Sequence, residues 1–293
     1  MLPSFQKKIN LEVTLVSISP DFRKLLRQLP IELPVFNPVA LELLLLLEKP
    51  GSHINTVVET INKDQALSAI VLRMANSAAF SGLEPSETIK AAAIRLGTRQ
   101  ISNLVMAASQ ANLHTSGIPV VNDIMRELWL HSHACAVGCW TVAMATHHRD
   151  IADKAYLAGL LHDIGKLFIL KAMERISLDG FAFELERNII LEVFTTMHVE
   201  LGCRLMDHWN IPAVYKTVVA DHHLEHVMTH NILLDIVRQV NFNSRRLHLS
   251  LNPAVVPYDA SPPEYMSLKM SEPDCTDLEE TMIKAGRFSS TSP

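Results

Sequence analysis

The most informative stretch of the chain, residues 158–166 (AGLLHDIGK), closes an apolar helical run with an adjacent imidazole and carboxylate, His162 and Asp163. Both groups are costly to bury without a partner, and both are good ligands for a divalent metal ion. Histidine is also dense around this stretch, since eleven of the fourteen histidines fall between His131 and His230. The pattern predicts a metal ion held between helices and placed to act on a phosphate ester.

The composition is that of a globular protein. The 293 residues are 48% hydrophobic and 19% charged, which is enough apolar material for a large core. The net charge of −5 and the 6% aromatic content provide no basic or stacking surface, so we expect no nucleic-acid partner. The longest apolar run, residues 43–47, is too short to cross a bilayer, and no signal peptide opens the chain. We therefore expect a cytoplasmic protein without membrane association, with its four cysteines reduced.

The periodicity of the chain predicts an all-α, multi-helical bundle. Beyond residue 37 the apolar residues recur at helical spacing, and the only candidate strand is a short one at residues 11–18. The break at residues 115–119 (TSGIP) separates two helical halves. The predicted organisation has four parts. An N-terminal segment (residues 1–32) precedes a first helical half (33–115) and a second helical half (116–250). An irregular C-terminal tail rich in Pro, Ser, Thr and Glu follows (251–293).

The predicted helices end at proline, glycine or capping residues. Asp64 and Asn76 fit a helix start and a helix end, and Thr98 fits an N-cap. The helices are expected at residues 38–48, 54–61, 66–76, 86–96, 98–114, 122–145, 150–161, 188–209, 212–223 and 231–241.

Four polar residues interrupt the apolar stripes of four different predicted helices: His131, His198, His222 and Asn241. Burying each of them unpaired would cost about 1–3 kcal/mol. A shared metal ion would satisfy several at once, together with His162 and Asp163. Taken singly, each histidine is more often a core residue that donates to a backbone carbonyl. The other histidines of this half are expected to be off the stripe, at helix ends or solvated, namely His133, His147, His148, His208, His226 and His230.

The histidine pattern resembles the HD superfamily of metal-dependent phosphohydrolases, in which His131 would be the first histidine and His162-Asp163 the paired motif. The wording LLHDIGK is especially similar to the HD-GYP branch. That resemblance adds a histidine before a downstream glycine, a tandem His pair and a glutamate one turn before the first histidine. The ligands it implies, for one or two ions of iron, manganese or nickel, are Glu127, His131, His162, Asp163, His198, His222, His223 and, at the position of the final aspartate, Asn241.

The chain departs from the HD-GYP pattern in two places. The final aspartate is replaced by Asn241, and the tandem histidines are followed by residues 224–228 (LEHVM) with no GYP sequence. Hydrolysis of cyclic dinucleotides is therefore not expected.

The N-terminal half resembles the HDOD domain. The similarity lies in Leu33-Pro34 and in residues 61–68 (INKDQALS), 71–80 (VLRMANSAAF) and 93–97 (AIRLG), and it extends over about residues 33–249. This resemblance implies an all-helical module of bacterial signalling proteins that usually lacks hydrolase activity and has a regulatory or scaffolding role.

Two functions follow from these patterns. The first is a signalling module that works with a protein partner and binds a metal ion without turnover; Asn241 favours it, because a neutral amide is a weaker ligand than a carboxylate. The second is a metal-dependent phosphohydrolase or phosphodiesterase. In that case Asp163 would bridge or orient the metal ion and its water, and Lys166 would face the phosphate.

Overall fold

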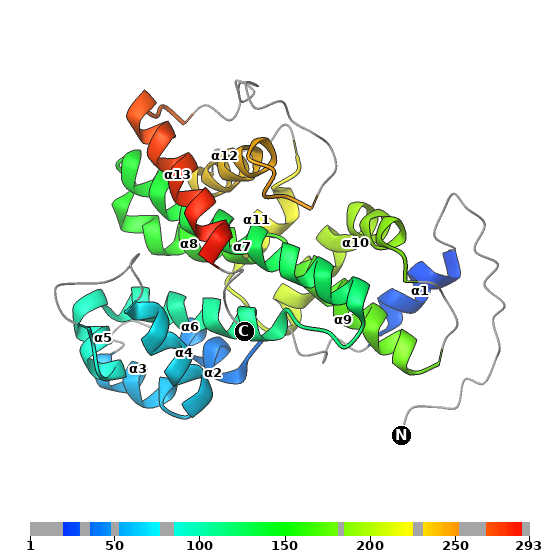
Figure 1. Ribbon diagram of the computed structural model, residues 1–293, viewed down its shortest axis with the longest axis horizontal. Helices are drawn as coiled ribbons and strands as arrows, with labels where there is room; N and C mark the ends of the chain where they lie inside the picture. The colour runs from blue at the N-terminus through cyan, green and yellow to red at the C-terminus, as the bar shows by residue number, and fades with distance from the viewer. Residues whose placement is uncertain are drawn as a thin grey trace.

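The computed structural model describes residues 20–29, 36–47, 53–76, 85–180, 185–224, 231–251 and 268–288, and all regular structure in these segments is helical (Figure 1). The all-α prediction is confirmed. The strand expected at residues 11–18 and the Leu33-Pro34 pair lie outside the described residues.

The first half of the chain is a small helical unit, drawn in blue to cyan in Figure 1. Its last helix lies against most of the others, and residues 101–110 of that helix are all buried. The same helix contacts the second half, where the Asn103 side chain donates to the Asp153 carbonyl over 3.2 Å. The helices are α2 (Pro38–Leu47), α3 (Ile54–Ile61), α4 (Gln65–Ala75), α5 (Ile89–Leu96) and α6 (Thr98–Leu113).

Of the capping residues predicted in this unit, Asp64 and Asn76 lie at cap positions of a helix and Thr98 does not. Asp64 caps α4 by accepting from the Leu67 amide at 2.9 Å, and Asn76 ends it, as predicted. The Asn76 side chain also exchanges two 2.8 Å hydrogen bonds with the Ser86 backbone, which fixes the approach to α5. The prediction for Thr98 was wrong. It is the first residue of α6, and Gly97 stands before it with φ of 85°, a value that favours glycine.

The second half is organised around the long helix α7 (Pro119–Ala145), which begins at a proline as helices often do. Helices from both ends of this half contact α7. The helices that contact it in this half are α8 (Ala152–Leu161), α9 (Ile164–Leu178), α10 (Arg187–His208) and α12 (Ile232–Arg246), whereas α11 (Ala213–Asp221) lies against α8, α10 and α12. The periodicity does not predict α9, because residues 164–170 are buried on nearly every side, with Lys166 as the exception, and show no one-sided apolar stripe.

Two further helices flank this unit. The N-terminal helix α1 (Pro20–Gln28) buries Phe22 and Leu26 and lies beside α9, and Arg27 forms an ion pair with Glu200 of α10 at 2.7 Å. No described helix has the length and hydropathy needed to traverse a lipid bilayer.

The prediction of an irregular C-terminal tail is wrong for α13 (Glu272–Phe288), drawn in red across α7 in Figure 1. Leu278, Met282 and Ala285 form its buried stripe, at the spacing of successive helical turns. This stripe contacts α7 where Gly138 leaves room, because a Cβ there would lie 3.1 Å from Met282. The stripe is narrow and lies among acidic and polar residues, so the sequence shows no clear helical periodicity there.

Two glycines of the AGLLHDIGK stretch allow close helix crossings. A Cβ on Gly159 would lie 2.6 Å from the Cys135 carbonyl oxygen, so α8 touches the backbone of α7. A Cβ on Gly165 would collide with the His198 carbonyl oxygen and lie 2.8 Å from the Gly202 nitrogen. The segment that carries His162 and Asp163 is therefore packed against two helices at backbone distance.

Gly165→Ala should force α9 away from α10. We expect the free energy of unfolding to fall by about 1–3 kcal/mol or more, as for other overpacked sites. Urea unfolding measures this, with Gly117→Ala as the matched control, because a Cβ on Gly117 meets no atom within 4 Å. Equal stabilities for the two variants would contradict the close crossing.

His133 is buried, contrary to the expectation that it lies off the packed face. Its ring stacks on Trp129 of the same helix, with centroids 5.1 Å apart and planes 19° apart, and Trp129 in turn contacts His114 at the end of α6. Burial lowers the pKa of His133 to about 4, so its ring is neutral in the folded protein.

The depressed pKa of His133 predicts a loss of stability in acid. Its contribution is complete above the unfolded pKa of about 6.5 and declines as the pH falls toward 4, because the unfolded chain then binds the proton more tightly. Between pH 7 and pH 5 the wild type should lose about 2 kcal/mol more of its free energy of unfolding than His133→Phe, which keeps the stacking but cannot titrate. Parallel pH profiles for the two proteins would disprove this assignment.

Candidate metal centre

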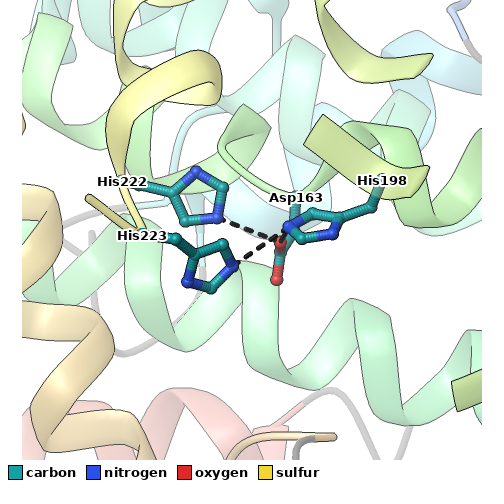
Figure 2. Close-up of side chains that lie close together, drawn as sticks. All are labelled: Asp163, His198, His222 and His223. Atoms are coloured by element: carbon teal, nitrogen blue, oxygen red, sulfur yellow. Dashed lines mark hydrogen bonds and ion pairs between the residues drawn. The ribbon is translucent and has the colours of Figure 1, made fainter. Parts of the chain in front are cut away.

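Asp163 lies at the junction of α8 and α9, and imidazoles from four helices surround it. His131 comes from α7, His162 ends α8, His198 comes from α10, and His222 ends α11. These four rings and the carboxylate are each at most 4% exposed. Figure 2 shows the rings of His198, His222 and the more exposed His223 gathered around the carboxylate. The sequence prediction that these groups meet in one interior pocket is confirmed.

The two oxygens of Asp163 face different histidines. Oδ2 lies 3.2 Å from Nε2 of His131 and 3.3 Å from Nε2 of His162. Oδ1 lies 3.6 Å from Nε2 of His198 and 3.5 Å from Nε2 of His222. The carboxylate thus stands between two groups of imidazoles.

The other nitrogen of each ring is held by a backbone carbonyl. Nδ1 of His162 lies 2.8 Å from the Gly159 oxygen, Nδ1 of His198 lies 2.5 Å from the Phe194 oxygen, and Nδ1 of His222 lies 3.0 Å from the Val219 oxygen. Nδ1 of His131 likewise lies 3.1 Å from the Leu249 oxygen. A carbonyl oxygen only accepts, so these contacts assign the ring proton to Nδ1. A neutral ring then presents the lone pair of Nε2 to Asp163.

Lone pairs and a carboxylate that face one another at these distances require a cation. Nε2 of His131 and Nε2 of His162 are only 3.2 Å apart. Protonating the rings is opposed by burial, which lowers the pKa of His198 to about 4 and also lowers that of His222. Burial would raise the pKa of Asp163, but the Lys166 ammonium foremost outweighs it, and that pKa lies well below its usual range. The carboxylate is therefore ionised, and the rings of His198 and His222 are neutral, as metal ligands are.

Two atoms of the pocket are left without hydrogen-bond partners, Oδ1 of Asp163 and Nε2 of His222. Each such buried atom costs about 1–3 kcal/mol unless something binds it. The possible metal-donor atoms form two sets, and within each set all donor atoms lie within 4.8 Å of one another. The first set is Asp163, His198, His222 and His223. The second set is His131, Cys135 and His162. The residues fit a divalent metal ion, with carbonyl-anchored imidazoles as its ligands.

Lys166 points inward. Its Nζ donates to Oδ2 of Asp163 over 2.6 Å, and its side chain is 12% exposed. The lysine thus neutralises the carboxylate, one turn into α9. The sequence prediction placed this amine toward a phosphate, and the structure places it on Asp163 instead.

One predicted ligand, Glu127, is not brought into the donor sets. It forms a two-point ion pair with Arg187, at 2.9 and 2.5 Å, and both side chains are 44% exposed. No His, Cys, Asp or Glu donor set among the described residues includes Glu127, so its assignment as a ligand is corrected.

Asn241 is buried on α12. The Ser244 hydroxyl donates to its backbone carbonyl at 2.8 Å and lies 3.5 Å from its side-chain oxygen.

Cys135 is the donor that sequence reasoning missed. From the sequence it is expected only to be one of four reduced cysteines, yet its sulfur lies 3.8 Å from Nδ1 and 3.9 Å from Nε2 of His131. Burial raises the pKa of its thiol to about 12. The signal that could have found it is the spacing of four residues from His131, which puts both side chains on one face of the helix.

Comparison with known proteins finds relatives in sequence and in fold. A curated relative from Treponema pallidum (strain Nichols), an uncharacterized protein, is 27% identical over 201 residues; the match covers 67% of this chain but only 38% of the relative's length. Among solved structures, an HDOD domain protein of unknown function from Geobacter sulfurreducens shares 21% identity with a TM-score of 0.71, covering 92% of this chain and 96% of that one. A candidate metal-dependent phosphohydrolase from Shewanella amazonensis SB2B shares 22% identity with a TM-score of 0.66, covering 91% and 96%.

These structural likenesses concern the fold. The family model of the HDOD domain matches residues 33–225, which include the first helical half, the second half as far as α11, and the pocket residues up to His222 and His223. The chain belongs to the HDOD family.

Proposed function

We propose that this chain is a metal-binding HDOD signalling module, in which the ion stabilises or reports on the state of the helical bundle and is not used for turnover. Its partner would be another signalling protein. The imidazole-rich donor set suits iron, manganese or nickel.

The observation that carries the proposal is the orientation of the rings. The backbone holds the Nδ1 protons of His131, His162, His198 and His222 outward, which leaves every Nε2 facing the ionised Asp163. An arrangement of this kind is unfavourable without a cation and is the usual preparation of histidine ligands.

Three features favour a role without turnover. The position where the HD-GYP pattern has its final carboxylate holds Asn241, which supplies no negative charge. The ammonium of Lys166, which could otherwise bind a phosphate, is engaged with Asp163. The central carboxylate and the four imidazoles around it are at most 4% exposed, which leaves little of the donor set open to a substrate.

Asp163→Asn should abolish tight metal binding, because it removes the only charged ligand shared by the two donor groups while keeping the shape of the side chain. We expect an affinity at least about a hundredfold lower, beyond the 10–100-fold cost of losing an outer-shell partner. Elemental analysis of protein purified without chelator and calorimetric titration of the metal-free protein measure this. The control is Glu127→Gln, which should bind the ion as the wild type does; equal binding by Asp163→Asn would refute the assignment.

A metal-dependent phosphohydrolase is the second candidate, and one observation favours it. The two oxygens of Asp163 face separate imidazole groups, an arrangement that suits a carboxylate bridging two ions. A bound ion would supply Lewis acidity toward a phosphoryl oxygen. In this chain Asp163 would orient it, and Lys166 would have to leave the carboxylate to reach the phosphate. The similarity to the candidate phosphohydrolase from Shewanella amazonensis is consistent with this function.

A hydrolysis assay separates the two functions. With p-nitrophenyl phosphate or bis(p-nitrophenyl) phosphate and added manganese or ferrous iron, we expect the wild type to show no more turnover than Asp163→Asn, because the pocket lacks the final carboxylate. Metal-dependent turnover that Asp163→Asn loses would establish the phosphohydrolase and overturn the signalling proposal.

A further inference from the structure

The two atoms of the pocket that lack hydrogen-bond partners lie on the same side of Asp163. They are Oδ1 of Asp163 and Nε2 of His222, which are buried, find no partner among the described residues and lie 3.5 Å apart. Nε2 of His198 lies 3.6 Å from the same oxygen, and Nε2 of His223 lies 3.0 Å from Nε2 of His198. These groups form the first donor set, whose side chains are drawn in Figure 2.

The spacing of this set fits one ion. Metal–nitrogen and metal–oxygen bonds of about 2.0–2.2 Å place neighbouring donors about 3.3–3.6 Å apart in a tetrahedron and about 2.8–3.1 Å apart in an octahedron. The neighbouring donor distances here are 3.0, 3.5 and 3.6 Å. One donor of the set, His223, is exposed, which gives an ion access to this side of the carboxylate from solvent.

The other oxygen of Asp163 already has a cation. Nζ of Lys166 donates to Oδ2 over 2.6 Å. Nε2 of His131 and Nε2 of His162 lie 3.2 and 3.3 Å from the same oxygen and 3.2 Å from each other. A second ion bound by these three atoms would share Oδ2 with the ammonium. The two positive charges would then be neighbours in a buried pocket, where water and salt screen their repulsion poorly.

The start of α9 holds the ammonium in this place. Lys166 follows Asp163 by three residues, a spacing that puts both side chains on one face, and its amide donates to the Asp163 carbonyl at 2.8 Å. The preceding residue, Gly165, packs against the His198 carbonyl at backbone distance. The backbone from which the lysine extends is therefore fixed against α10.

We propose that the pocket holds one ion, on the Oδ1 side of Asp163, and that the ammonium of Lys166 takes the place of a second ion on the Oδ2 side. This inference rests on the proposed function, since it takes an ion at Asp163 as given. Lys166 is a positioning residue that sets the number of ions, because it neutralises Oδ2 and repels a cation from His131 and His162. With an uncharged residue at this position, Asp163 could bridge two ions, as carboxylates do in two-metal hydrolytic centres.

Manganese(II) binding to the metal-free protein tests the proposal, with equilibrium dialysis to count the ions and electron paramagnetic resonance to report their separation. Two ions bridged by a carboxylate, about 3.5–4 Å apart, couple magnetically and lose the resolved hyperfine spectrum of an isolated ion. We expect one isolated ion per wild-type chain. Lys166→Met should bind two coupled ions, whereas Lys166→Arg, which keeps the charge, should bind one.

The matched control is Lys171→Met. Lys171 lies on the same helix and its side chain is 14% exposed, against 12% for Lys166, but its amine donates to the Thr115 carbonyl away from the donor sets. This variant should bind one isolated ion, as the wild type does.

The wild type decides the question if Lys166→Met fails to fold, because its own ion count is predicted, and dialysis against ferrous iron or nickel supplies the same count. Two ions per wild-type chain would overturn the role of Lys166 and leave the metal-binding module intact. A Lys166→Met protein with the circular dichroism of the wild type that binds only one ion would do the same. A wild type that binds none of the three metals would overturn both proposals.

Discussion

The Asp163 carboxylate is ionised in a pocket almost closed to water, and the surrounding imidazoles turn their lone pairs toward it. The geometry originates in the helices themselves. His162 and His222 each end a helix, where the carbonyls of the last turn have no amide partner, and each ring donates to such a carbonyl three residues back. His198 donates to the Phe194 carbonyl four residues back, within its helix. Carbonyls within one helical turn therefore hold three of these rings, whereas His131 depends on the Leu249 carbonyl from a distant part of the chain.

A pocket of this size needs helices that cross at backbone distance. Gly159 brings α8 onto α7, and Gly165 with Gly202 brings α9 onto α10. Asp163 lies between the two glycines of its own segment, so the crossings that close the pocket also centre the carboxylate in it. Stability and metal affinity are thereby linked, because a side chain at either crossing would separate the donors as well as the helices.

The balance of charges argues for binding more strongly than for turnover. One carboxylate and one ammonium, Asp163 and Lys166, are paired at the centre, and the rings of His198 and His222 beside them are neutral. A hydrolytic centre of two ions would need more negative charge to hold them. Among the described residues the donor sets contain no carboxylate besides Asp163, and of the imidazoles only that of His223 is exposed. A site of this kind suits an ion that is retained.

Much of the pocket was predictable, because a polar residue on an otherwise apolar stripe has to point inward. His131, His198 and His222 were found by that rule, and His162-Asp163 by its sequence setting. The rule fails where burial is not one-sided. The first turns of α9 are buried on nearly every side and show no one-sided periodicity. The apolar stripe of α13 is narrow and lies among acidic residues, so the sequence does not indicate it clearly.

The sequence by itself determined the helical class and the inward imidazoles, because both depend on spacing along one helix. Only the tertiary structure decided which donors meet. Glu127 and Cys135 both lie one turn from His131, yet Arg187 from α10 holds the glutamate at the surface, while Gly159 from α8 brings the second imidazole to the sulfur. Those partners come from distant parts of the chain, so the sequence of α7 alone does not predict them.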